Sequence, residues 1–218
     1  MIEAVVQVFS ITLEAFFPRP KPFAKDKIDQ IAEWLTDSAD GFALRPDQVR
    51  VRHTDIVFDY VLSASFYGGN ATFVRDAEKA ALFARGARTR QDADLLRGTA
   101  IRFARFAASE EKLPLMFSAN AHALLPSIDD REQFLKRFRP DPRVTSPGTL
   151  GYVQLEGWPD AVRVAIEPSF NTPQSLFFSW QTNLAASEDW QSTFERLVGV
   201  IEEATTVYGV QFLPLAES

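Results

Sequence analysis

The sequence predicts an α+β fold, a two-layer α/β sandwich in which helices cover one face of a mainly antiparallel sheet. Three observations predict it. The chain of 218 residues contains an internal repeat, helical and strand periodicities follow one another in the same order in both halves, and the absence of cysteine leaves a hydrophobic core to stabilise the fold. Because amphipathic helices and alternating strands each have one apolar side, they bury these sides against each other as two layers.

Two similar segments define the repeat. They are FSITLEAFFP at 9–18 and FSANAHALLP at 117–126, and four of the ten positions are identical at an offset of 108 (from 9 to 117). Each segment is a predicted strand that ends at a proline and precedes a predicted helix. We therefore predict two β-α-β-β-β-α units, at 1–110 and 111–218, which pack together as one pseudo-two-fold unit.

In the first unit, the apolar spacing predicts a helix at 24–38, a strand at 56–66 and a helix at 91–108. Apolar residues recur every three to four positions in the two helices, whereas they alternate with polar residues in the strand. Residues 76–86 fit a helix, because their alanines have helical spacing, or a strand. We predict a strand, because the second unit has one at the matching place.

In the second unit, the same patterns predict helices at 129–139 and 187–207, with strands at 150–156, 162–167 and 176–181 between them. Asp129 and Asp130 stand at the start of the first of these helices. Carboxylates there accept hydrogen bonds from free backbone amides and interact favourably with the helix dipole. We therefore interpret this pair as helix-capping residues rather than as metal ligands.

Composition excludes several classes of function. Without cysteine and with only His53 and His122, the chain has no thiolate nucleophile and no histidine-rich metal site, and it lacks the glycine-rich phosphate-binding motifs. We predict no cofactor and no metal. The 23 basic and 29 acidic residues give a net charge of −6, which argues against a nucleic-acid partner.

The N-terminal segment MIEAVVQVFSITLEAFF is apolar enough to suggest a signal peptide. It has no basic residue at its start, and Glu3, Gln7 and Glu14 interrupt it. No stretch reaches the 18 or so apolar residues of a membrane span. We therefore expect a soluble, cytoplasmic protein without a membrane partner.

The outward-facing positions of the two opening strands form a candidate ligand-binding site. Since strand side chains alternate between faces, the polar residues point away from the core. They are Ser10, Thr12 and Glu14 in the first strand, and Ser118, Asn120 and His122 in the second. If the two strands are neighbours, these groups share one surface, and the repeat aligns Glu14 with His122. A Glu–His pair has the groups for acid–base chemistry or for binding a polar ligand; the alternative is a solvated sheet face.

An arginine-dense stretch between 85 and 105 is a second candidate. Arg88, Arg97 and Arg105 are candidate residues for binding an acidic protein partner. The alternative is a solvated helix face on which the arginine stems cover apolar surface.

Three functional hypotheses follow, given in order of preference. The first is a non-enzymatic module that binds a small molecule or peptide over the exposed sheet face. The second is a protein-interaction or assembly subunit, with a protein partner or a second copy at a sheet edge or at the Arg-rich helix. The third is an enzyme that uses Glu14 and His122.

Five aromatic residues could line a pocket or interface, or could fill the core; they are Tyr67, Trp158, Phe170, Phe177 and Trp180.

Overall fold

The computed structural model describes most of the chain. The described residues are 1–21, 55–56, 59–60, 62–66, 71–110, 113–139, 141, 143, 147–170 and 173–215. Within them the chain forms a mixed α/β fold with three helices and a large, mainly antiparallel open sheet. The helix predicted at 24–38 lies outside the described residues.

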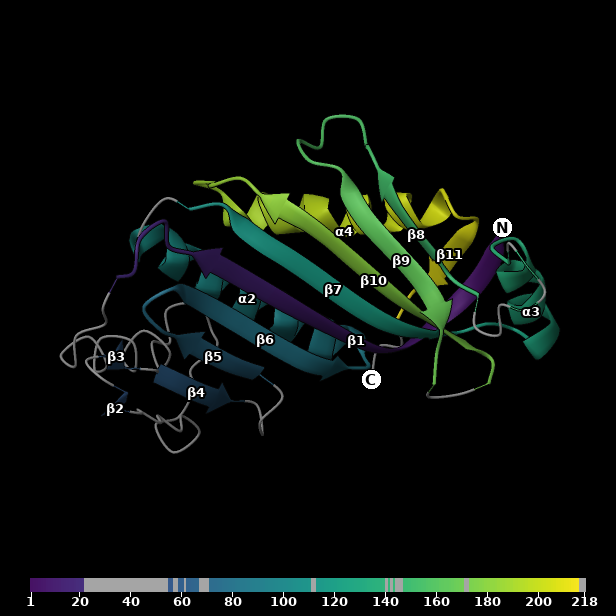
Figure 1. Cartoon of the computed structure of the whole chain (residues 1–218), viewed down its shortest axis with the longest axis horizontal. Coiled ribbons are helices and arrows are strands. Elements are labelled where there is room, and N and C mark those ends of the chain that lie inside the picture. Colours follow the sequence, from purple (N-terminus) through teal and green to yellow (C-terminus); the bar gives the residue numbers. More distant parts are fainter. Residues whose placement is uncertain are drawn as a thin grey trace.

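Eight strands follow one another across the main sheet in the order β4-β5-β6-β1-β7-β10-β9-β8 (Figure 1). Their bounds are β4 Leu62–Phe66, β5 Ala71–Arg75, β6 Lys79–Ala87, β1 Ile2–Phe16, β7 Leu115–Leu124, β10 Ser175–Leu184, β9 Val162–Pro168 and β8 Thr149–Val153. Each neighbouring pair is antiparallel. A ninth strand, β11 (Val210–Leu213), runs parallel to the start of β1. The two predicted opening strands, β1 and β7, are therefore direct neighbours at the centre of the sheet.

The predicted strands were largely found, with one difference in the first half. The ambiguous segment at 76–86 is a strand, because β6 occupies most of it. The single strand predicted at 56–66 is instead divided. The short strands β2 (Asp55–Ile56) and β3 (Asp59–Tyr60) pair with each other, and only β4 joins the main sheet. Alternation of apolar residues alone does not show which strand each part of the segment pairs with.

Helices α2 (Arg90–Glu110) and α4 (Trp190–Thr206) lie on the same side of the sheet, and α3 (Ile128–Lys136) lies at one end of it (Figure 1). α2 packs on β6 and β1, and α4 packs on β9 and against α2. We call the side of the sheet opposite α2 and α4 the open face. The core fills the space between the sheet and these two helices.

The alternation of side chains in the opening strands is confirmed. In β1, Ile11, Leu13 and Ala15 are buried, and in β7 every second residue from Leu115 to Ala123 is buried. The core also contains Trp158 and Trp180, whose indole N–H groups donate hydrogen bonds to Thr182 (3.0 Å) and Thr205 (3.1 Å). These two tryptophans are thus core residues.

The helix starts are held by short polar side chains, and at α3 the capping residue is Ser127 rather than the predicted Asp129 and Asp130. Ser127 caps α3, because its hydroxyl accepts a hydrogen bond from the Asp130 backbone amide at 3.1 Å, and Asp129 and Asp130 lie in the first turn. At the start of α2, Asp92 accepts hydrogen bonds from the backbone amides of Arg88 (3.0 Å) and Thr89 (3.1 Å). These bonds favour the carboxylate and hold the pKa of Asp92 below its ordinary value.

This lowered pKa predicts a pH-dependent contribution to stability. A group whose pKa is lower in the folded state stabilises the fold above its unfolded-state pKa, which is about 3.9 for aspartate, and loses this contribution as the pH falls through the folded-state value. Asp92→Ala should therefore lower the midpoint of thermal unfolding at pH 7, and the gap to wild type should narrow below about pH 4. Gln91→Ala, at an exposed neutral neighbour, is the control and should give a constant gap. If the midpoints of wild type and Asp92→Ala differ by the same amount at pH 7 and at about pH 2.5, the Asp92 carboxylate does not stabilise the fold as described.

Candidate functional site

Two rows of polar side chains cross the open face at the centre of the sheet. The first row is Ser10, Asn120 and Ser179, and the second is Thr12, Ser118 and Gln181. Paired residues on adjacent strands point to the same side of a sheet, so β1, β7 and β10 each contribute one residue to each row. We call these six residues the polar rows. All of them are half-buried.

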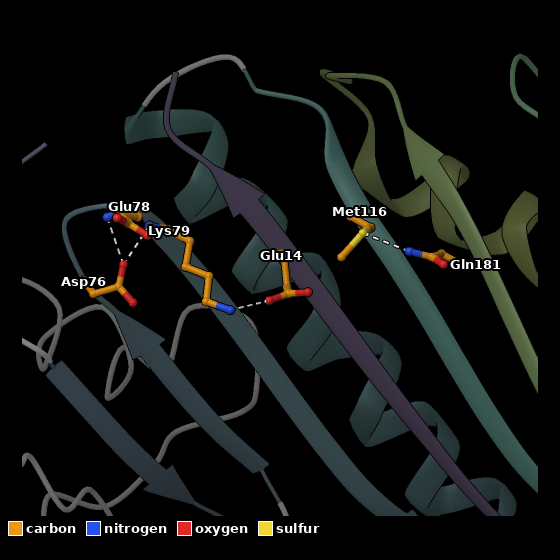
Figure 2. Close-up of polar contacts among 6 residues, drawn as sticks. All are labelled: Glu14, Asp76, Glu78, Lys79, Met116 and Gln181. Atoms are coloured by element: carbon orange, nitrogen blue, oxygen red, sulfur yellow. Dashed lines mark hydrogen bonds and ion pairs between the residues drawn. The ribbon is translucent and has the colours of Figure 1, made fainter. Parts of the chain in front are cut away.

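The rows form a nearly flat array of uncharged hydrogen-bonding groups. Neighbouring strands are about 4.8 Å apart and alternate residues of one strand about 7 Å apart, so the array measures about 10 by 7 Å. Within the part of the chain that the structure describes, the side chains of five members form no hydrogen bond with another residue: Ser10, Thr12, Ser118, Asn120 and Ser179. The sixth, Gln181, directs its amide nitrogen to the Met116 sulfur at 3.0 Å (Figure 2).

Glu14 lies beyond one end of the polar rows and is bound by a lysine. Its Oε1 accepts a hydrogen bond from Lys79 Nζ at 2.6 Å, across the β1–β6 pair (Figure 2). The Glu14 side chain is only 13% exposed, so this contact shields its charge from solvent on the open face. Asp76 fixes the turn before β6, because its carboxylate accepts hydrogen bonds from the backbone amides of Glu78 (2.9 Å) and Lys79 (2.8 Å). The backbone that carries Lys79 is thereby held in place.

His122 lies beyond the other end of the rows. Its Nδ1 is 2.9 Å from the Ser169 hydroxyl, and its ring centre is 5.2 Å from that of Phe177. Across the central strand pair His122 faces Val8, whereas Glu14 faces Met116. Val8 and Glu14 are six positions apart on β1, so about 20 Å separates His122 from Glu14 along the strands.

The structure thus places all six predicted residues on one face but does not bring Glu14 and His122 together. The reason is the antiparallel register. Ile11 faces Ala119, its counterpart at the offset of 108, and counterparts lie farther apart the farther they are from this pair. Ser10, Thr12, Ser118 and Asn120 lie next to this pair and are therefore neighbours, and their role as ligand-binding residues stays a prediction.

Sequence reasoning did not include Ser179 and Gln181, which complete the polar rows. Their strand, β10, follows β7 in the sheet but is more than 50 residues away along the chain. A local signal did exist, because Ser179 and Gln181 alternate with the buried residues Phe178 and Trp180. That signal predicts which face they occupy, but not which strand lies beside them.

The three candidate partner-binding arginines lie along α2 but do not form one cluster. Arg88 precedes the helix, and Arg97 forms an ion pair of 2.9 Å with Asp94 on the same helix. Arg105 is exposed, and its charge makes a small contribution to the lowered pKa of Asp189, which is due mainly to the hydrogen bond with the Ser192 side chain. Two of the three therefore already act on carboxylates of this chain.

A separate surface pocket of about 410 Å³ lies at the end of the sheet near β8. It is lined by Gly148, Thr149, Leu150, Glu167, Pro168 and Phe170. Phe170 is 97% exposed, so of the four described aromatic residues singled out from the sequence it is the one that stands open to solvent, while Phe177 lies half-buried beside His122. Tyr67 lies outside the described residues.

The described residues contain neither a candidate metal cluster nor a helix suited to crossing a membrane. No group of three histidine, aspartate or glutamate side chains there is arranged so that it could hold a metal ion. None of the helices described has the length and apolar character that crossing a membrane requires.

Comparison with known proteins gave no assignment. No protein-family model matches the chain, and no curated protein matches its sequence significantly.

Proposed function

We propose that this protein is a non-enzymatic binding module that holds a small molecule or short peptide over the open face of its sheet, at the polar rows. The observation that supports this most directly is the set of five side chains without an internal hydrogen bond in the described residues, gathered on three adjacent strands. These half-buried groups are left to bond with water, and a ligand with matching polar groups can replace that water.

The chemistry of the rows favours an uncharged ligand. Serine and threonine hydroxyls and the Asn120 amide both donate and accept hydrogen bonds, and none of them carries charge. The nearest carboxylate on β1, Glu14, is neutralised by Lys79. A ligand with hydroxyl or amide groups spaced at about 5–7 Å would match the array, and Phe177 and Met116 offer apolar contacts at its two ends.

An acid–base enzyme receives no comparable support. Glu14 and His122 are too far apart to share a proton, and each has another partner, Lys79 for Glu14 and Ser169 for His122. General acid–base catalysis needs its groups within hydrogen-bonding reach of the same reacting atoms.

The proposal includes the duplicated architecture, a two-layer sandwich of two β-α-β-β-β-α units. In support, β6, β5 and β4 follow β1 outward in one direction, and β10, β9 and β8 follow β7 in the other. The central register agrees with the offset of 108, since Ser10 pairs with the counterpart of Thr12, and Thr12 with the counterpart of Ser10. The cytoplasmic location expected from the sequence stays a prediction.

Backbone amide NMR of the full chain, titrated with a set of uncharged amides and polyols, tests the binding proposal. We expect shift changes concentrated on the polar rows of β1, β7 and β10. Because one hydrogen bond contributes about 0.5–1.5 kcal/mol, Thr12→Ala or Asn120→Ala should each weaken binding about two- to tenfold. Thr72→Ala is a matched control, because Thr72 is a half-buried residue of the same face on β5, two strands away from β1.

Two results would count against the proposal. One is a titration in which no compound of the set shifts the polar rows. The other is binding that maps to the pocket beside β8, or that Thr72→Ala weakens as much as Thr12→Ala does.

A further inference from the structure

β8 ends the main sheet and has few of the features that usually protect an edge strand. In the described residues it pairs with β9 alone, so its other backbone edge has no strand partner there. Exposed edges are normally blunted by charged residues or proline, but Thr149–Val153 contains neither. Leu150 and Tyr152, both on the open face, are 57% and 70% exposed.

The sequence of β8 is symmetric in character around Gly151. One apolar residue stands on each side of the glycine, and beyond these stand Thr149 and Val153, which are both β-branched. An antiparallel strand of the same sequence, centred on Gly151, would face Leu150 with Tyr152 and Thr149 with Val153. Aliphatic–aromatic and β-branched pairs are favourable across strands.

We infer that a second copy of this chain pairs with β8, antiparallel and centred on Gly151, so that two sheets join edge to edge. The two-fold axis of such a pair is perpendicular to the sheet. The open faces of both copies, with their polar rows, would therefore lie on the same side of one continuous sheet. The inference does not depend on the proposed ligand binding.

Charge permits this contact. The chain carries a net charge of −6, so most approaches of two copies meet repulsion, but β8 is uncharged along its whole length. Two charged residues of β9 flank it on the open face: Arg163 pairs with Tyr152, and Glu167 lines the pocket beside Leu150. One is basic and the other acidic, so together they do not add to the excess of acidic charge.

The exposed apolar area is sufficient for a weak dimer. Each aromatic side chain buries about 150–250 Å² when it is fully covered. Tyr152, together with Phe170 at the pocket beside Leu150, therefore offers about 300–500 Å² per copy at most, to which Leu150 and the strand backbone add. The total for two copies approaches the roughly 1,000 Å² of a specific interface, which indicates a dimer that dissociates on dilution.

Charge variants analysed by sedimentation provide the test. Wild type should pass from monomer to dimer between about 1 µM and about 1 mM, the range expected for a small interface. Leu150→Lys with Tyr152→Lys, and separately Leu150→Glu with Tyr152→Glu, would place like charges opposite each other and should weaken the dimer at least tenfold. An equimolar mixture of the two double variants should recover it, because opposite charges then face each other.

Cysteine variants test the register, since the chain has no cysteine of its own. Opposed residues of antiparallel strands are about 4.5–5.5 Å apart at Cα, which allows a disulfide. A mixture of Leu150→Cys with Tyr152→Cys should form a covalent dimer under mild oxidation, whereas neither variant alone should. All the substituted side chains are exposed, so the fold should tolerate them.

Three results would overturn the inference. They are a wild type that stays monomeric over the whole concentration range, a dimer that persists in both charge variants, and cross-linking of each single cysteine variant as efficiently as the mixture. The first result, if the edge nevertheless binds an unrelated extended peptide, would assign β8 to that other partner.

Discussion

Phe178→Ala is expected to lower the free energy of unfolding by about 3–5 kcal/mol, the range for truncating a buried phenylalanine. The ring of Phe178 is fully buried on the helix side of β10. It stacks on Trp180 with ring centres 5.7 Å apart and meets the edge of Phe212 at 5.1 Å. Its removal would leave a cavity between β10 and β11, where rigid neighbours cannot collapse to fill it.

The adjacent residue provides a matched control, because Phe177 has the same side chain on the opposite face. It is half-buried beside His122, and Phe177→Ala should change stability by about 1 kcal/mol or less. Urea unfolding of both variants measures the difference. Equal losses would show that the open face is packed as tightly as the core, and the description of this face as open would then be wrong.

The sequence predicted the faces of strands well, because the face of a residue is a local property. In β7 the alternation assigned Phe117, Ala119 and Ala121 to the core, and all three are buried. The repeat also indicated that the two opening strands correspond, and they lie side by side at the centre of the sheet.

The partners across the sheet were not predictable in the same way. Alignment of Glu14 with His122 in the repeat suggested a pair, but equivalence under a two-fold axis is not contact. In an antiparallel pair, residues at matching positions of the two strands lie at opposite ends of the pairing. Glu14 therefore faces Met116 rather than His122. Its charge is paired with Lys79, on the strand at the other side of β1. Neither partner could be inferred without the register.

Short elements with non-local partners were also missed. β11 is four residues long and is held by parallel pairing with the start of β1, at the other end of the chain. A segment of this length carries too little periodicity to be distinguished from a loop. The hydrogen bonds that connect the core tryptophans to Thr182 and Thr205 are likewise non-local, since 24 and 25 residues separate the partners.

The hydrogen bond between Trp180 and Thr205 predicts a second large loss of stability. Thr205 is 1% exposed, and its hydroxyl accepts a hydrogen bond from the Trp180 indole while donating to the Ile201 carbonyl at 2.7 Å. Thr205→Val keeps the shape of the side chain but leaves a buried N–H without its acceptor. We expect a loss of about 1–3 kcal/mol in the free energy of unfolding, measured by urea denaturation.

Thr206→Val is the control that separates loss of the indole hydrogen bond from loss of a hydroxyl in the helix. Thr206 is exposed, and its hydroxyl also donates to a carbonyl of the preceding turn, that of Glu203, at 2.7 Å. Among the described residues it has no tryptophan partner. Thr206→Val should therefore cost little, within about 0.5 kcal/mol. If Thr205→Val is no worse than Thr206→Val, the indole is satisfied by another acceptor and the Trp180–Thr205 bond does not fix α4 to the sheet. If the loss is large and shrinks in a Trp180→Phe background, the bond itself accounts for it, because that background has no N–H to leave unsatisfied.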